Sequence, residues 1–343
     1  MITRSRVKAL AGLSLLAVLA ACASPAPPPP PPVAYIPPPI TLSPRVVEQA
    51  AAYRGYVQSA GAISPNFADG LQVAQAVKTG SAYESRQLMS GAVAYAAVVA
   101  LQDPAFVSAV REFAADRNQR TQVAQQILRD PAYAAVIKGA DTAAGLIISA
   151  LGTDGTQVYM AGRAVKQAAY DVQRQKWSKA DVANRPERLA EAKALSARPH
   201  LPSQDETARL HQVSTGLAPL GLTPTSAPAP YSPLVIRGLA VAALAALGEA
   251  GDAHMATIQP LLAEPTGGQC LNLAKLNLYQ CLAVSKPHYE DVFCVGQHIL
   301  MDTGQCLIKS SGAAMPYIPP PPVPVKAEVK TPAKKKAPAK KKG

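Results

Sequence analysis

Prolines are gathered into three stretches of this 343-residue chain, and they limit where regular structure can form. Eleven of the 33 prolines lie in residues 23–44, seven lie in residues 198–233, and a further group follows residue 314. Proline has no backbone N–H and its ring clashes with the preceding helical turn, so these stretches cannot continue a helix or a sheet. The sequence therefore predicts two structured segments, residues 45–197 and 234–313, joined by a proline-rich linker over 198–233.

Both structured segments have the apolar spacing and the capping residues of helices. Asp103 precedes Pro104 and Asp130 precedes Pro131, so each pair offers a capping carboxylate before a proline that can begin a helix. Apolar side chains then recur three to four residues apart, as they do on one face of a helix. We expect an all-α fold, with a body of antiparallel helix pairs followed by a disulfide-linked helical hairpin near the C-terminus.

Residues 1–21 have the pattern of a bacterial export signal. Three basic residues precede a 13-residue apolar run, which has the length of a signal core and is too short to span a bilayer. The run ends in Leu19-Ala20-Ala21-Cys22, which resembles the lipobox of bacterial lipoproteins at all four positions. In that family the cysteine thiol carries a diacylglycerol and the chain is cut before the cysteine. The alternative is an ordinary secretory signal with a chance cysteine.

The resemblance implies lipidation at Cys22 and attachment to a membrane through the N-terminal lipid. Ala23, the next residue, is similar to the sorting pattern for the outer membrane, so the expected location is the outer membrane, with the body in the periplasm or on the cell surface. Residues 22–44 then form a lipidated, proline-rich linker, which adopts an extended polyproline II conformation.

Residues 314–343 have the composition of a disordered proline- and lysine-rich tail. Residues 326–343 hold eight lysines and one glutamate, and a block of this charge binds polyanions by counterion release. Because the signal directs the chain out of the cytoplasm, we expect lipopolysaccharide, peptidoglycan or anionic lipid as the partner, and not nucleic acid. A purely solubilising tail is the alternative. The expected polyanion-binding residues are Lys334, Lys335, Lys336, Lys340, Lys341 and Lys342.

Four cysteines, Cys270, Cys281, Cys294 and Cys306, lie within 37 residues. An exported protein meets an oxidising compartment, so an even number of cysteines predicts disulfides. Cys270 and Cys281 are eleven residues apart and share one face of a helix, and Pro287 allows a second helix to fold back. Partners in such a hairpin lie at equal distances from the turn, which favours the nested pairs Cys281–Cys294 and Cys270–Cys306.

Two alternatives to the disulfides remain open at this point. Asp291, Cys294 and His298 recur on one helix face, with Cys281 across the hairpin, and together they form a plausible four-ligand zinc set. Free buried thiols are the second alternative. Oxidation would consume two of the zinc ligands, so the disulfides remain the main prediction, and we expect no metal.

No motif of this sequence predicts catalysis. Asp302-Thr303-Gly304 resembles the Asp-Thr-Gly loop of aspartic proteases over a few residues only, and we interpret it as the C-terminal end of a helix at the glycine. His288 and His298 lie near acidic residues, but no nucleophile accompanies them. A hydrolase that uses the region from His288 to Asp302 is therefore the weakest hypothesis, and no cofactor is expected.

The leading hypothesis is a non-enzymatic outer-membrane lipoprotein with a structural or scaffolding role in the cell envelope. Its lipid fixes it in the membrane and its basic tail contacts an anionic envelope component. The alternative is an accessory subunit of an envelope assembly, secretion or adhesion machine, which would bind a partner protein through its helical body.

Overall fold

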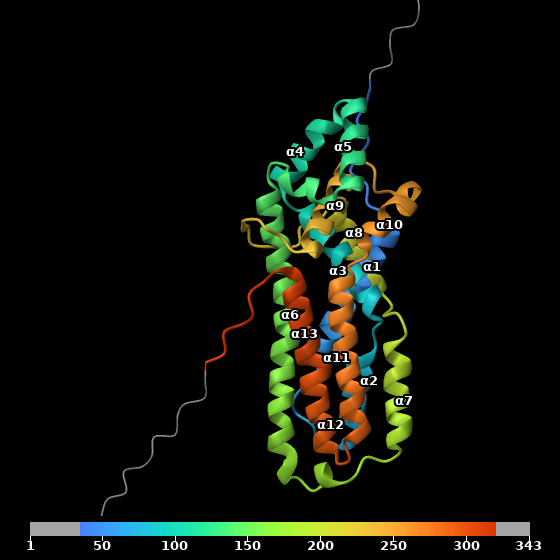
Figure 1. The fold of residues 1–343 in the computed structure, drawn as a ribbon, viewed down its shortest axis with the longest axis vertical. Helices are drawn as coiled ribbons and strands as arrows, with labels where there is room; N and C mark the ends of the chain where they lie inside the picture. The colour runs from blue at the N-terminus through green and yellow to red at the C-terminus, as the bar shows by residue number, and fades with distance from the viewer. Residues whose placement is uncertain (1–34, 320–343) are drawn as a thin grey trace, which may run out of the picture. The chain divides into compact units, whose positions relative to one another are not determined.

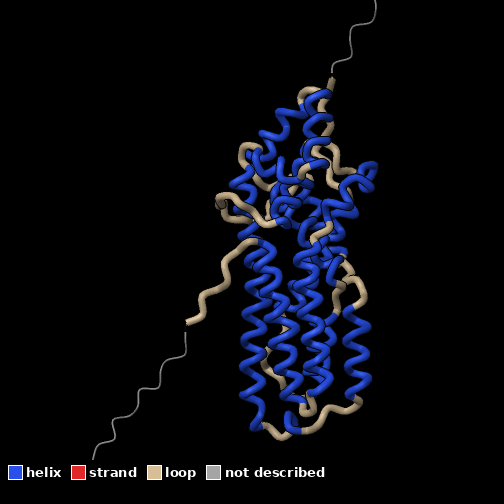
Figure 2. Tube along the Cα trace, viewed as in Figure 1, coloured by secondary structure: helices blue, strands red, loops and turns tan. Residues whose placement is uncertain are grey.

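Helices dominate the computed structural model, which describes residues 35–319 (Figure 1). Within this range the chain forms thirteen α-helices, four short 3₁₀ helices and one π-helix, and Figure 2 shows no β-sheet. The expected all-α fold is confirmed. The α-helices are α1 (Pro44–Gly61), α2 (Gly70–Ser81), α3 (Ser85–Ala100), α4 (Pro104–Ala114), α5 (Arg117–Arg129), α6 (Ala140–Asp171), α7 (Arg185–Ser196), α8 (Gln204–Ser214), α9 (Pro233–Ala246), α10 (Met255–Leu262), α11 (Pro265–Val284), α12 (His288–Cys294) and α13 (Asp302–Ser311).

The centre of the core is formed by α3 and α9, whose side chains are buried on nearly every face. Small residues let the two helices approach closely, since a Cβ built at Gly238 of α9 would lie 2.5 Å from the Cβ of Ala96 of α3. Among residues 35–319, no single helix has the length and hydropathy needed to cross a membrane. The pair α3 and α4 would pass that test together, but the chain bends by 87° between them.

The segments 45–197 and 234–313 share this core. α9 packs against α3, and α13 runs along α6, as Figure 1 also shows. The proline-rich stretch 198–233 contains α8, which packs on α1, and its later part is held by a hydrogen bond from the Ala227 N–H to the Asp141 carbonyl (3.0 Å). This stretch therefore belongs to the same compact unit as the helices on either side of it.

The two Asp-Pro caps lead to different structures. Asp103 caps α4, because its Oδ1 accepts the Phe106 N–H at 2.8 Å. Asp130 accepts the Ala132 N–H at 3.0 Å, but the chain after it forms only a 3₁₀ helix, Pro131–Val136. The long helix α6 begins later, after Gly139, whose φ of 83° is favourable only for glycine.

The chain from His288 to Ser311 is one continuous helical rod made of α12, a π-helix (Val295–Met301) and α13. The expected helix end at Gly304 is therefore wrong. A Cβ at Gly304 would lie 2.5 Å from the backbone nitrogen of Tyr159, so this glycine is needed where α13 packs against α6. The rod instead ends before Gly312, which has a φ of 79°.

The π-helix explains how two cysteines of this rod come to share a face. Cys294 and Cys306 are twelve residues apart, which would rotate them by about 120° in a regular α-helix. A π turn accommodates one extra residue, so these twelve positions turn as about eleven would, and the offset falls to about 20°. The same offset of about 20° separates Cys270 and Cys281, eleven residues apart on α11.

Candidate functional site: the four-cysteine hairpin and the cleft beside it

Two disulfides join α11 to the rod that follows it. Cys281 is bonded to Cys294 with 5.8 Å between their Cα atoms, and Cys270 is bonded to Cys306 with 5.7 Å. The nested pairing expected from the hairpin geometry is confirmed. Cys294 and Cys306 are buried in the shared core, so these bonds fasten the hairpin where it also packs against its neighbours.

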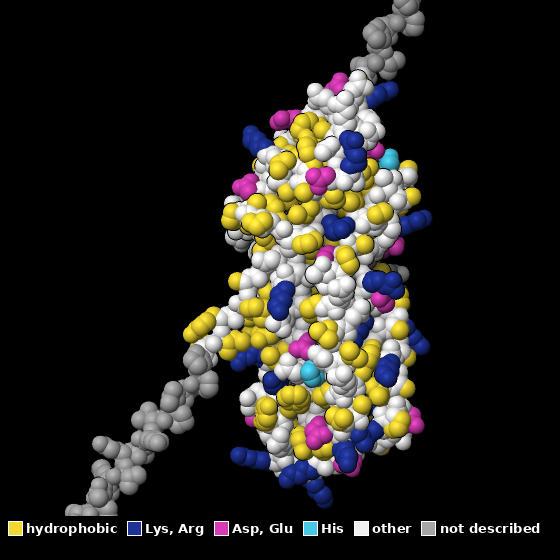
Figure 3. Space-filling model, viewed as in Figure 1, with side chains coloured by type: hydrophobic (Ala, Val, Ile, Leu, Met, Phe, Trp, Pro, Cys, Tyr) yellow, Lys and Arg dark blue, Asp and Glu magenta, His cyan; other side chains and the backbone are white. Residues whose placement is uncertain are grey.

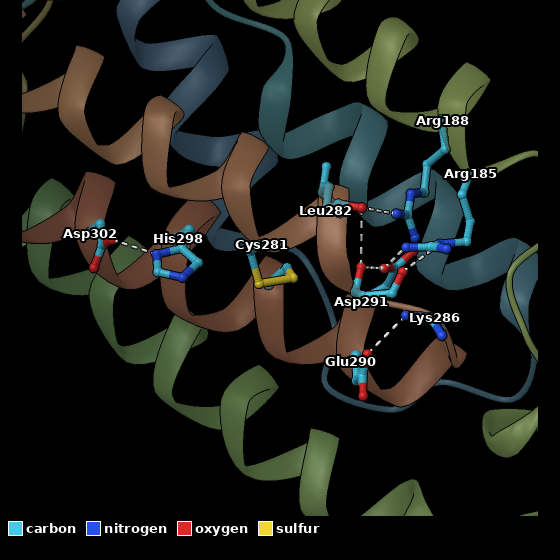
Figure 4. The surroundings of a disulfide bond; sticks show 11 residues. Arg185, Arg188, Cys281, Leu282, Lys286, Glu290, Asp291, His298 and Asp302 are labelled. Carbon is cyan, nitrogen blue, oxygen red and sulfur yellow. Dashed lines mark hydrogen bonds and ion pairs between the residues drawn. A yellow bond between two sulfur atoms is a disulfide. The ribbon is translucent and has the colours of Figure 1, made fainter.

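The four residues considered as zinc ligands have other partners. Cys281 and Cys294 are bonded to each other, and His298 Nδ1 lies 2.8 Å from Asp302 Oδ2. Asp291 points to the other side of the disulfide, toward Arg188 (Figure 4). Among the residues that the structure describes, no group of three or more metal-ligating side chains converges. The zinc alternative for this set is therefore wrong, because the disulfide uses two of its ligands.

Arg188 and Asp291 form a buried ion pair between α7 and α12 (Figure 4). Arg188 Nη1 donates to both oxygens of Asp291, at 2.5 and 2.6 Å, and Ser285 Oγ donates to the same carboxylate at 2.7 Å. The two charged side chains expose only 8% and 3% of their surface. Burial raises the pKa of the Asp291 carboxyl, and the contacts with Arg188 and Ser285 oppose that change.

Two arginines of α7 also satisfy carbonyl groups at the C-terminal end of α11. Arg188 Nη2 donates to the Leu282 carbonyl, and Arg185 donates to the carbonyls of Ser285 (2.7 Å) and Ala283 (2.9 Å). A helix leaves its last carbonyls without partners and carries partial negative charge there, so guanidinium groups are well suited to this position. No sequence motif indicated these arginines, because their partners lie about a hundred residues further along the chain.

A cleft of about 390 Å³ lies beside this ion pair, between α2 and α7. Lys78 and Glu191 form an ion pair at 2.9 Å among its lining residues, and the Arg188 Nε is buried there without a hydrogen-bond partner. The ring of His288 packs on Gly70, where a Cβ would lie 2.3 Å from it. The lining residues offer charged groups of both signs for binding, and none of them carries a hydroxyl or a thiol.

Lys275 is a buried cation that sequence reasoning did not single out. Its Nζ donates to the carbonyls of Tyr83 and Ser196, each at 2.7 Å, and lies 4.1 Å from the centroid of the Tyr83 ring. Burial lowers its pKa to about 8. Lys275 lies on the face of α11 that Leu271 and Leu278 bury, and a lysine on an apolar helix face is the signal that could have revealed it.

Asp302, the aspartate of the Asp-Thr-Gly segment, is held by its own helical rod. Its carboxylate contacts His298 at 2.8 Å and accepts the side-chain amide of Gln297 at 2.9 Å. Burial raises the pKa of Asp302, but these hydrogen bonds outweigh it, so the pKa lies below its usual value. Thr303 is buried and its Oγ1 lies 3.2 Å from the Tyr83 hydroxyl. The segment is thus a packed part of the helix.

Cys22 and the six tail lysines lie outside the described residues, so lipidation and polyanion binding stay predictions. Comparison of the chain with known proteins found no matching protein-family model. No curated protein and no solved structure matched it either.

Proposed function

We propose that this chain is a non-enzymatic lipoprotein of the bacterial outer membrane, anchored through acyl groups on Cys22. The observation that carries the proposal is the sequence Leu19-Ala20-Ala21-Cys22 at the end of a basic and apolar export signal. The two disulfides support it, because such bonds form and persist in oxidising compartments such as the periplasm.

The body has a structural or scaffolding role in this proposal. One core joins its helices, and the hairpin is fastened by two disulfides and by the buried Arg188–Asp291 pair. Such ties favour a fixed arrangement of helices over a hinged one. The polycationic tail then contacts lipopolysaccharide, peptidoglycan or anionic lipid, and this contact weakens with salt because it depends on counterion release.

The intact mass of the protein purified from membranes tests the proposal, with thiols alkylated before and after reduction. We expect a chain that begins at Cys22 with added acyl mass, and four alkylatable thiols that appear only after reduction. A chain without acyl groups would overturn the membrane anchor. Thiols that alkylate without reduction would contradict the disulfides and, with them, the support they give to export.

A second candidate function is that of an accessory subunit that binds a partner protein through the body. The cleft between α2 and α7 favours it, because its lining offers charged groups of both signs, such as Lys78 and Glu191, to a bound partner. Removal of residues 326–343 separates the two functions. Loss of binding to anionic envelope components in the shortened chain would assign that binding to the tail, whereas partner proteins that stay bound to it would assign their contacts to the body.

A further inference from the structure

α6 carries a groove of about 830 Å³ along the outside of the bundle. Its floor combines aromatic, apolar and basic side chains, including Tyr159, Arg163 and Lys166. Met160 and Tyr170 expose 45% and 53% of their surface, so this floor presents apolar and aromatic surface to a ligand. Hydrophobic atoms gather at this edge of the molecule in Figure 3, where the C-terminal segment leaves the body.

A second hollow, of about 450 Å³, continues this groove toward the end of α6. Both hollows are lined by Tyr170, so they adjoin there. The second one is mainly apolar and is lined by the aromatic residues Tyr289 and Phe293, by the disulfide residue Cys281 and by Val284, which is 74% exposed. The two hollows together make an elongated, aromatic-lined surface. Its far end, beside Phe293, is not covered by any of the described residues.

The chain's own C-terminal segment enters the groove at its near end. After α13 it becomes extended, and Ala313 lies against α6 at Gly152, where a Cβ would be 2.6 Å from the Ala313 Cβ. Further along, Ile318 and Pro319 line the groove together with the part of α6 around Arg163. The six steps from residue 313 to residue 319 cover about 19 Å when extended, and the eleven steps from residue 152 to residue 163 rise about 17 Å in a helix, so the segment is long enough to pass from Gly152 to Arg163.

The rest of the groove suits an apolar, proline-rich segment, and the next six residues of the chain are Pro320-Pro321-Pro322-Val323-Pro324-Val325. They carry no charge, and four of them are prolines that lack an N–H. Sequences of this composition favour polyproline II, whose preformed shape docks on aromatic-lined grooves. At about 3.1 Å per residue they reach about 19 Å further, which carries them past Tyr170 to the end of α6.

We propose that residues 320–325 dock in this groove and cover Tyr170 and the hollow beside Phe293. Arg163 and Lys166 can donate to the backbone carbonyls of the docked segment, which polyproline II leaves free. The segment ends just before Lys326, so the lysine-rich tail starts at the end of α6, where Arg174, Lys176 and Lys179 are exposed. Lys and Arg side chains gather at this end of the bundle in Figure 3. Tail and body then form one cationic surface. The use of this surface to bind a polyanion rests on the proposed function, whereas the docking itself does not.

The rate of chemical labelling of Tyr170 tests the docking, followed site by site by mass spectrometry. Four purified chains are compared: the full mature chain, a chain that ends at Val325, a chain that ends at Pro319, and a full-length chain with Gly-Ser in place of residues 320–325. A segment docked four-fifths of the time lowers labelling of Tyr170 about fivefold in the first two chains, because only the undocked fraction reacts. Tyr133, half-buried on the 3₁₀ helix Pro131–Val136, serves as the reference and should label equally in all four.

Equal labelling of Tyr170 in the four chains would overturn the proposal. A photo-crosslinker placed at position 170 of the full chain identifies the occupant, and we expect products that join position 170 to residues 320–325 of the same chain at every protein concentration. Products with a second copy, or with another proline-rich protein, would instead assign the groove to an external partner. None of these outcomes depends on the lipid anchor or on polyanion binding, so they leave the proposed function to its own test.

Discussion

Removal of the two disulfides, one pair at a time, should destabilise the fold by unequal amounts. The variants replace Cys270 and Cys306, or Cys281 and Cys294, or all four residues, with alanine. Each bond restricts the unfolded chain, and the restriction grows with the length of the loop that the bond closes. Because the inner loop lies within the outer one, the effect of each bond depends on whether the other is present.

The sequence separations set the size of the effect. The inner bond closes a loop of 13 residues, which corresponds to about 2.9 kcal/mol. The outer bond closes 36 residues, but with the inner bond in place only about 23 of them are free, and the contribution is about 3.4 kcal/mol. The two bonds together contribute about 6.3 kcal/mol, and loss of the inner pair alone, from a chain that keeps the outer one, costs about 2.5 kcal/mol.

Urea unfolding at fixed temperature, followed by circular dichroism, measures these values on the chain from residue 23 to 343. Reduced wild-type protein is the matched control, since it loses both cross-links but keeps the sulfur atoms in the core. The loss of the outer pair should cost about 1 kcal/mol more than the loss of the inner pair. If the inner pair proves the more costly, or if the fourfold variant loses less than either paired variant, loop closure in the unfolded chain is not the source of the stabilisation.

Three further predictions concern buried groups. Lys275 has a pKa of about 8 in the folded chain and 10.5 in the unfolded chain, so the folded state binds fewer protons between these pH values. The free energy of unfolding should therefore rise by up to about 1.4 kcal/mol per pH unit from pH 8 to 10, and urea titrations of Lys275→Met should lack this rise. Arg188→Met should cost about 3–5 kcal/mol by leaving Asp291 buried and unpaired, whereas the double variant with Asp291→Leu should recover most of that loss in the same urea assay. Gly304→Ala should destabilise the fold by about 1–3 kcal/mol, because the added Cβ forces α13 away from α6. Gly268→Ala on α11, whose added Cβ meets nothing within 4 Å, should instead stabilise the helix by about 0.5–1 kcal/mol. Thermal melts measure both effects, and equal effects at the two glycines would refute the packing argument.

Local signals in the sequence accounted for the helices and for the pairing of the cysteines. Caps such as Asp103 act within three residues, and the hairpin places Cys281 and Cys294 around a turn at Pro287, so both features could be derived from spacing alone. The same local reasoning failed at Gly304, because a glycine that ends a helix and a glycine that lets two helices touch have the same sequence pattern. Only the position of Tyr159 on α6 distinguishes them.

The long-range contacts were not predictable from this sequence. Arg188 meets Asp291 across a separation of 103 residues, and Lys275 meets the Tyr83 carbonyl across 192. The π-helix was also missed. It could have been inferred from the cysteines themselves, since a spacing of twelve after a spacing of eleven requires one extra residue in the second helix if both pairs are to close.

The two ends of the folded body are fastened to opposite ends of one helix. The Thr41 N–H donates to the Ala245 carbonyl at the C-terminal end of α9 (3.0 Å), and Ser232, which caps the N-terminal end of α9, donates through Oγ to the Ser310 carbonyl in the last turn of α13 (2.7 Å). A chain held by a lipid at one terminus and by a bound polyanion at the other would be pulled between these two points. Part of the tension would then run along the axis of a helix that is buried on nearly every face and whose backbone hydrogen bonds lie parallel to that axis. α9 would then carry part of a tensile load between the two ends of the folded body.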